Sequence, residues 1–247
     1  MPLEGLILPY TYEDIAGMID HSLLNPALTV AELEAGCELA RRYGVASVCI
    51  LPYYAARCSG LLDGSGVRPS TTIGFPHGGH TTPVKLAEVR QALQDGAVEL
   101  DMVINISKAR SGDWQYVADE ICMLTEATHA DGAKIKVIFE NAYLEDGMKI
   151  RLCQICSEIG VDWVKTSTGY AASGATIADL QLMRKHSSPR VQVKAAGGIR
   201  TLDALLEVRA IGVTRVGASR TAAMLDECRQ RLGLPPLTIG TGTLRSA

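Results

Sequence analysis

The sequence predicts the α/β fold class, as a single (β/α)8 barrel with an extra N-terminal helical segment. Short β-rich runs alternate with helix-like segments along the chain, and such alternation favours parallel strands. Eight runs over 247 residues give roughly 31 residues per repeat, about the size of one βα unit. Eight units without a long break indicate closure into a TIM barrel, with a doubly wound open sheet as the alternative.

Each predicted strand is a short, mainly aliphatic run, which is typical of a parallel sheet buried on both faces. Hydrophobic residues make up 47% of the chain and aromatic residues 5%, so we expect aliphatic side chains to fill both the barrel and the layer beneath the helices. The runs are 20–24, 46–51, 70–75, 98–105, 134–140, 162–167, 191–196 and 214–218.

Capping signals mark the helices between these runs. Thr29 and Glu32 have the Thr-x-x-Glu spacing of a capping box, and Pro83 suits a first helical turn. Further helices are expected to begin near Thr176 and Thr201. Left-handed C-caps are expected where a glycine separates a helix from the next strand, at Gly44, Gly96, Gly132, Gly160 and Gly212.

The chain ends are predicted to lie outside the barrel. Residues 1–19 form an N-terminal extension with a helical part at 12–19, and 238–247 form a flexible tail rich in Thr, Gly and Ser. No shift in composition divides 1–247 into two domains. No apolar run approaches the ~18–20 residues of a membrane span, and the absence of basic residues before Arg41 argues against a secretory signal.

Charge and cysteine content narrow the functional class. The net charge of −3 argues against a dedicated nucleic-acid binder. The seven cysteines are scattered, and the pair Cys153 and Cys156 lies within the predicted helix 145–159, with no second pair at zinc-like spacing. Free thiols in a reducing cytoplasm are therefore expected.

Two lysines within strands are the strongest functional signal. Lys165 and Lys194 lie in consecutive apolar runs, where both side chains can point into the barrel. Mutual repulsion and burial lower the pKa of an amine and supply a neutral nucleophile. Such an amine attacks a carbonyl carbon to form a Schiff base.

Two neighbouring strands add charged groups. In 98–105, Asp101 alternates with Leu100 and Met102, which are expected to face the helices. Lys136 shares the inward face of its strand, whereas Lys134 is expected to be exposed at the strand start. Asp101 can move protons directly or through a water. In the alternative interpretation, these charges form a buried ion-pair network that fills the barrel.

Glycine-rich strand ends predict a phosphate site. Barrels often bind phosphate at the loops after strands seven and eight, through backbone N–H groups and a helix N-terminus. The alternative is a set of ordinary tight turns. The residues concerned follow runs six, seven and eight and are Thr168, Gly169, Gly197, Gly198, Ser219 and Arg220.

Histidines offer a weaker alternative. His77 and His80 are three residues apart in a glycine-rich loop and could bind a metal, but no carboxylate or third histidine is close in sequence. We therefore expect no metal. His21 is expected to be structural.

These motifs resemble the deoxyribose-phosphate aldolase family of class I aldolases. They occur in the family's order between Asp20 and Arg220, and the segment around Lys165 is the most specific. The segments are Asp20-His-Ser-Leu-Leu24, Ser47-Val-Cys-Ile50, Ile73-Gly-Phe-Pro-His-Gly78, Glu99-Leu-Asp-Met-Val-Ile-Asn105, Lys136-Val-Ile-Phe-Glu140, Val164-Lys-Thr-Ser-Thr-Gly169, Val193-Lys-Ala-Ala-Gly-Gly-Ile-Arg200 and Gly217-Ala-Ser219.

The resemblance implies a role for each site residue. Lys165 is the Schiff-base nucleophile, Lys194 lowers its pKa and assists proton transfer, and Asp101 works with an ordered water. Lys136 sits beside Asp101 in the charged network. The implied pocket floor consists of Asp20, Ser22 and Cys49. The implied phosphate ligands are Thr168, Gly169, Gly197, Gly198 and Ser219.

The implied reaction is the reversible cleavage of 2-deoxy-D-ribose 5-phosphate to D-glyceraldehyde 3-phosphate and acetaldehyde, in deoxyribose phosphate catabolism. It needs no cofactor, because the Schiff base on Lys165 polarises the substrate as zinc does in class II aldolases. The alternatives are a Schiff-base aldolase with another acceptor, a phosphate-binding isomerase or synthase, a metal-dependent lyase, and a silent sugar-phosphate binder. Family members are commonly dimers, so a homodimer is one expectation.

The chain departs from the family pattern at three positions. Arg220 stands where many members have a second Ser, and Asn141 replaces the usual Thr after Glu140. Tyr170 occupies a position where some members have Lys and others an aromatic residue. The tail also lacks the terminal Tyr of some members. These departures bear on which aldehyde is accepted and leave the Schiff-base chemistry intact.

Overall fold

The structure is a computed structural model that describes residues 9–237. The predicted tail at 238–247 and the start of the predicted N-terminal extension lie outside the described residues. Within them, eight parallel strands close into one barrel in sequence order, and β8 pairs with β1. The predicted TIM barrel is therefore confirmed over the open sheet. The strands are β1 Ile19–Leu23, β2 Ser47–Ile50, β3 Arg68–Ile73, β4 Glu99–Val103, β5 Lys134–Ile138, β6 Trp163–Lys165, β7 Gln192–Ala196 and β8 Arg215–Ala218.

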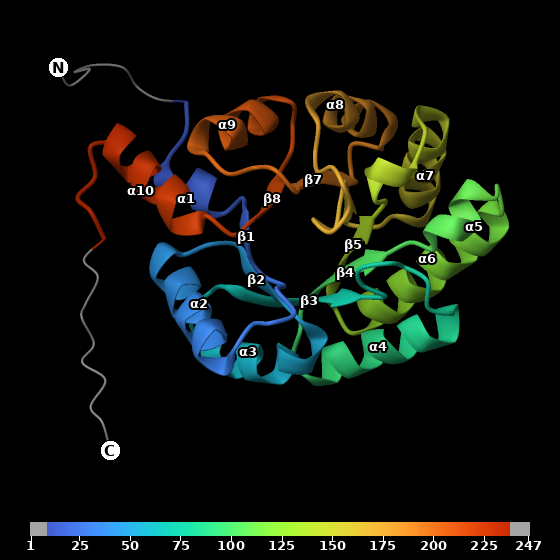
Figure 1. Cartoon of the computed structure of the whole chain (residues 1–247), viewed down its shortest axis with the longest axis horizontal. Helices are drawn as coiled ribbons and strands as arrows, with labels where there is room; N and C mark the ends of the chain where they lie inside the picture. Colours follow the sequence, from blue (N-terminus) through green and yellow to red (C-terminus); the bar gives the residue numbers. More distant parts are fainter. Residues whose placement is uncertain (1–8, 238–247) are drawn as a thin grey trace.

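Helices form a ring around the strands (Figure 1). The predicted capping box of Thr29 and Glu32 begins α2, and Gly44 and Gly160 end α2 and α7 in the left-handed conformation. The helices are α1 Tyr12–Ala16, α2 Val30–Tyr43, α3 Ala55–Leu62, α4 Thr82–Gln94, α5 Ile106–Arg110, α6 Trp114–Ala130, α7 Asp146–Ile159, α8 Ile177–His186, α9 Leu202–Ala210 and α10 Thr221–Arg231, with short 3-10 helices at Pro52–Tyr54 and Asn141–Tyr143.

The N-terminal helix is shorter than predicted. The expected helical part at 12–19 ends at Gly17, the C-cap of α1. Ile19 instead begins β1, where it pairs with Val216 of β8. Barrel closure needs this strand, and that requirement outweighs the helical pattern that precedes it.

The two faces of the strands differ in chemistry. Leu100 and Met102 belong to the hydrophobic cluster and are fully buried, as predicted for side chains that face the helices. The expectation that aliphatic side chains also fill the barrel is wrong. The strands instead point buried charged side chains inward, Asp20, Glu99, Asp101, Lys136, Lys194 and Arg215 among them.

Two other sequence expectations concern membranes and thiols. No helix within residues 9–237 is long and apolar enough to cross a membrane. All seven cysteines are unpaired. Cys153 and Cys156 lie within α7 and are buried, and burial raises the pKa of Cys153 to about 11. The thiol of Cys153 is therefore protonated at neutral pH and is a poor nucleophile.

Candidate active site

Asp101 lies at the centre of three buried lysines. Lys165 and Lys194 each place Nζ 2.7 Å from Asp101 Oδ2, and Lys136 places Nζ 2.7 Å from Oδ1. The strand register produces this arrangement, because Asp101 is level with Lys136 on β5 and Lys165 is level with Lys194 on β7. The structure therefore brings together the predicted catalytic residues.

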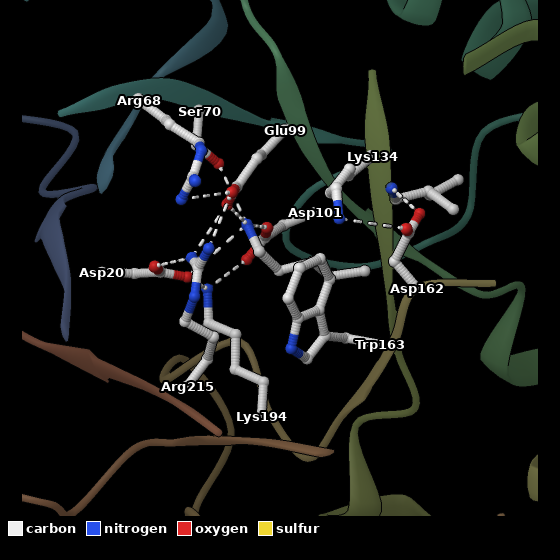
Figure 2. A network of polar contacts seen from close by, with 12 residues as sticks. Asp20, Arg68, Ser70, Glu99, Asp101, Lys134, Asp162, Trp163, Lys194 and Arg215 are labelled. Carbon is white, nitrogen blue, oxygen red and sulfur yellow. Dashed lines mark hydrogen bonds and ion pairs between the residues drawn. The ribbon is translucent and has the colours of Figure 1, made fainter. Parts of the chain in front are cut away.

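A second layer of charges lies beside this group. Arg215 donates to both carboxylate oxygens of Glu99, at 2.9 and 2.8 Å, and also to Asp20 (Figure 2). Lys194 reaches Asp20 Oδ2 at 2.5 Å. The lysine pair is thus part of a buried ion-pair network, as the alternative interpretation of the sequence predicted, and the catalytic role of the pair stays a prediction.

Arg215 belongs to this network but was not among the predicted site residues. It lies in the apolar run 214–218, so the criterion that selected Lys165 and Lys194 also applied to it. Its guanidinium stacks over Trp163, with 4.9 Å between Cζ and the ring centroid. Lys134 remains largely exposed near Asp162, as expected.

The pKa values of the two central lysines move in opposite directions. Burial lowers the pKa of Lys165, and the Lys194 charge lowers it further against the opposing effect of Asp101. Burial acts on Lys194 in the same sense, but the carboxylates of Asp101 and Asp20 outweigh it and raise its pKa. The lowered pKa predicted for both lysines therefore holds for Lys165 alone.

Asp101 is held as an anion. Burial by itself favours its protonated form, but Lys136, Lys165 and Lys194 together bring its pKa well below the ordinary value. The site thus combines a lysine biased toward the neutral amine, a charged lysine and a carboxylate that contacts both. This combination suits Schiff-base formation and proton transfer.

A cavity of about 210 Å³ opens above the lysines. Lys165 and Lys194 line this cavity, and so does Arg200, which was not among the predicted site residues. Ten residues predicted for the site line this cavity: Asp20, Ser22, Cys49, Lys165, Thr168, Gly169, Lys194, Gly197, Gly198 and Ser219.

Two predicted binding residues do not line this cavity. Lys136 is fully buried within the ion-pair network, where its amine forms ion pairs with Asp101 and Glu99. Arg220 is exposed at the N-cap of α10, two residues after the end of β8. Arg200 supplies the arginine of the cavity wall instead.

Several backbone amides around the cavity have no protein acceptor. Within the described residues, the N–H groups of Gly169, Gly197, Gly198 and Ser219 make no hydrogen bond to protein. They follow β6, β7 and β8, and α10 begins next to Ser219. Unsatisfied amides beside a helix N-terminus form a favourable environment for an anion.

A larger cavity of about 580 Å³ adjoins the first, and Thr168 lines both. Glu140 holds Thr168 in place by accepting hydrogen bonds from its backbone N–H at 3.2 Å and from its hydroxyl. Burial raises the pKa of Glu140. Glu140 has the left-handed backbone conformation, φ 57°, which is uncommon for a residue with a side chain.

The histidines occupy different environments. His77 lines the larger cavity, whereas His80 Nδ1 lies 3.5 Å from Glu88. In the part of the chain that the structure describes, no group of three or more His, Cys, Asp or Glu side chains is arranged to hold a metal ion. His21 is buried and contacts the Thr221 hydroxyl at 2.8 Å, as expected for a structural residue.

Comparison with known proteins agrees with this geometry. The model of the DeoC/LacD family aldolases matches residues 15–219. The chain belongs to this aldolase family. It is 64% identical over 230 residues to deoxyribose-phosphate aldolase of Rhodopirellula baltica, covering 93% of this chain and 95% of the relative.

More distant aldolases of the family show the same relationship. Deoxyribose-phosphate aldolase of Thermococcus gammatolerans is 43% identical over 87% of this chain and 97% of its own. The tetrameric deoxyribose phosphate aldolase structure from Aeropyrum pernix superimposes with a TM-score of 0.82 at 31% identity. That match covers 88% of this chain and 92% of the relative.

Proposed function

We propose that this protein is a class I aldolase that reversibly cleaves 2-deoxy-D-ribose 5-phosphate to D-glyceraldehyde 3-phosphate and acetaldehyde. The observation that carries the proposal is the pair Lys165 and Lys194 on one carboxylate oxygen of Asp101, at the base of a cavity with free amides. The relatives named deoxyribose-phosphate aldolases support the choice of substrate.

The proposed cleavage begins at Lys165. Its neutral amine attacks the substrate aldehyde carbon, and loss of water from the adduct gives a protonated Schiff base. The ammonium of Lys194 is placed to donate the proton that leaves with this water. Burial lowers the pKa of Lys165, and the charge of Lys194 lowers it further, which favours the neutral amine.

Carbon–carbon cleavage follows. The C3 hydroxyl loses its proton to a relay in which Asp101 acts through a water, and the C2–C3 bond breaks. Its electron pair moves into the iminium and leaves an enamine on Lys165, while C3 to C5 depart as glyceraldehyde 3-phosphate. Protonation of the enamine at C2 and addition of water then release acetaldehyde and the free lysine. The iminium is the electron sink, so the proposed reaction uses no metal or cofactor.

The substrate phosphate is proposed to bind at the ends of β6, β7 and β8. The free amides of Gly169, Gly197, Gly198 and Ser219 support this position, and Arg200 adds a positive charge. The proposal includes a cytoplasmic location, which free thiols favour. It also includes a homo-oligomer; the relative from Aeropyrum pernix is a tetramer, and a homodimer remains the prediction for this chain.

Trapping with borohydride tests the proposed function. Incubation with acetaldehyde and borohydride is expected to add an ethyl group to the Lys165 side chain, visible by peptide mass spectrometry. Lys165→Leu should lose both the adduct and the cleavage activity, whereas Lys134→Leu, a change at an exposed lysine, should keep both. Normal cleavage by Lys165→Leu would contradict the proposal. Activity lost to a chelator and restored by zinc would favour a metal-dependent lyase.

A further inference from the structure

Tyr170 stands between the two cavities of the barrel mouth. Thr168 lines both cavities, Gly169 lines the smaller one, and Tyr170 and Ala171 line the larger one. The short segment 168–171 is therefore the wall that separates the cavity containing Lys165 from its larger neighbour.

The Tyr170 side chain contacts other segments through both its hydroxyl and its ring. Its hydroxyl donates to the carbonyl oxygen of Leu24 at 2.5 Å, and Leu24 lines the smaller cavity. Its ring packs edge-on against Phe75, with 5.5 Å between the ring centroids. Leu24 follows β1 and Phe75 follows β3, whereas Tyr170 follows β6, so the side chain spans the barrel mouth.

Tyr170 is also fixed at its backbone. Its N–H donates to the Thr168 hydroxyl at 3.0 Å, and that hydroxyl in turn donates to Glu140. The wall is thus anchored to the segments that follow β5, β1 and β3. The larger cavity behind it offers apolar surface from Pro76 and Ile106 and hydroxyls such as that of Ser107.

We propose that Tyr170 is a specificity-determining residue that restricts the acceptor aldehyde to short chains by closing the reaction cavity toward the larger one. This inference rests on the proposed aldolase function. Without the phenol ring, the far end of a longer aliphatic aldehyde extends past Thr168 into the larger cavity while its carbonyl group stays beside the enamine on Lys165.

The test compares two unphosphorylated acceptors, so that any effect on phosphate binding cancels. The addition of acetaldehyde to propanal and to hexanal is measured as kcat/KM for the acceptor. Tyr170→Ala is expected to raise the hexanal-to-propanal ratio by roughly tenfold or more, the scale of apolar pocket discrimination. Tyr170→Phe keeps the ring against Phe75 and is expected to raise the hexanal-to-propanal ratio far less.

Two further variants sharpen the result. In the Tyr170→Ala background, Ser107→Leu fills part of the larger cavity and should reverse most of the gain. Tyr53→Ala removes a ring that is 89% exposed and lines neither cavity, so the ratio should stay at the wild-type value. An unchanged ratio in Tyr170→Ala, or equal rises in Tyr170→Ala and Tyr170→Phe, would overturn the inference.

The borohydride adduct separates this inference from the proposed function. If the wild-type enzyme forms no adduct on Lys165, the aldolase proposal itself fails. If wild-type and Tyr170→Ala proteins both form the adduct and the ratio is unchanged, only the role of Tyr170 is refuted.

Discussion

Lys165 and Lys194 donate to the same oxygen of Asp101, each with Nζ 2.7 Å from Oδ2. Their pKa values nevertheless shift in opposite directions from the ordinary value of 10.5. Asp20 accounts for the difference, because it contacts Lys194 and not Lys165. One lysine is therefore biased toward the neutral nucleophile, and its neighbour stays charged.

Replacing Lys194 by Met should move the pH profile upward. The Lys194 charge lowers the pKa of Lys165, so its removal raises that pKa and reduces the neutral fraction at any given pH. The rising limb of kcat/KM for cleavage is expected at higher pH, and loss of the proton donor should cost about 10²–10⁴-fold in rate. A rising limb that stays at the wild-type pH or moves to lower pH would contradict this prediction. Lys134→Met is the control.

Replacing Asp101 by Asn should move the rising limb of the pH profile to lower pH. Asp101 raises the pKa of Lys165, so its loss lowers that pKa further and shifts borohydride trapping with acetaldehyde to lower pH. Turnover should fall by about 10²–10⁴-fold, because the proton relay is removed. Three buried lysines also lose a carboxylate, which should cost about 3–5 kcal/mol of unfolding free energy. Borohydride trapping that shifts to higher pH would refute the effect of Asp101 on the pKa of Lys165.

Arg200 and Arg220 are expected to differ in phosphate binding. Arg200 lines the reaction cavity, whereas Arg220 does not. Arg200→Gln should raise KM for 2-deoxyribose 5-phosphate by roughly tenfold, the scale of a lost hydrogen bond to a charged group. Its rate with unphosphorylated 2-deoxyribose should not change, and Arg220→Gln should have little effect on either substrate. If the wild-type enzyme cleaves both substrates equally well, the phosphate site is wrongly placed.

The buried pair of Lys85 and Glu120 should matter for stability. Lys85 Nζ lies 2.9 Å from Glu120 and donates to the carbonyl oxygen of Val103 at 2.8 Å, with both side chains fully buried. Glu120→Ala leaves the lysine without its counter-ion and should cost about 3–5 kcal/mol in urea unfolding. Glu126→Ala, an exposed change on the same helix, should stay within about 0.5 kcal/mol. Equal losses of unfolding free energy in Glu120→Ala and Glu126→Ala would show that the buried pair contributes nothing to stability.

The candidate site was predictable from the sequence wherever a charge interrupts an apolar strand. Lys165, Lys194 and Asp101 were found in this way, and Arg215 carried the same signal without being assigned. Arg200 and Tyr170 lie outside the strands, where the sequence has no periodicity that tells which cavity a side chain reaches. Their positions depend on contacts across the barrel mouth.

The sequence by itself determined the barrel and the inward position of Asp101, Lys136, Lys165 and Lys194, because both follow from short-range periodicity along single strands. Only the tertiary structure decided which of the two lysines keeps a raised pKa. That choice depends on Asp20 of β1 reaching Lys194 of β7, 174 positions away in the chain. Electrostatic interaction falls with distance in space, and barrel closure sets that distance.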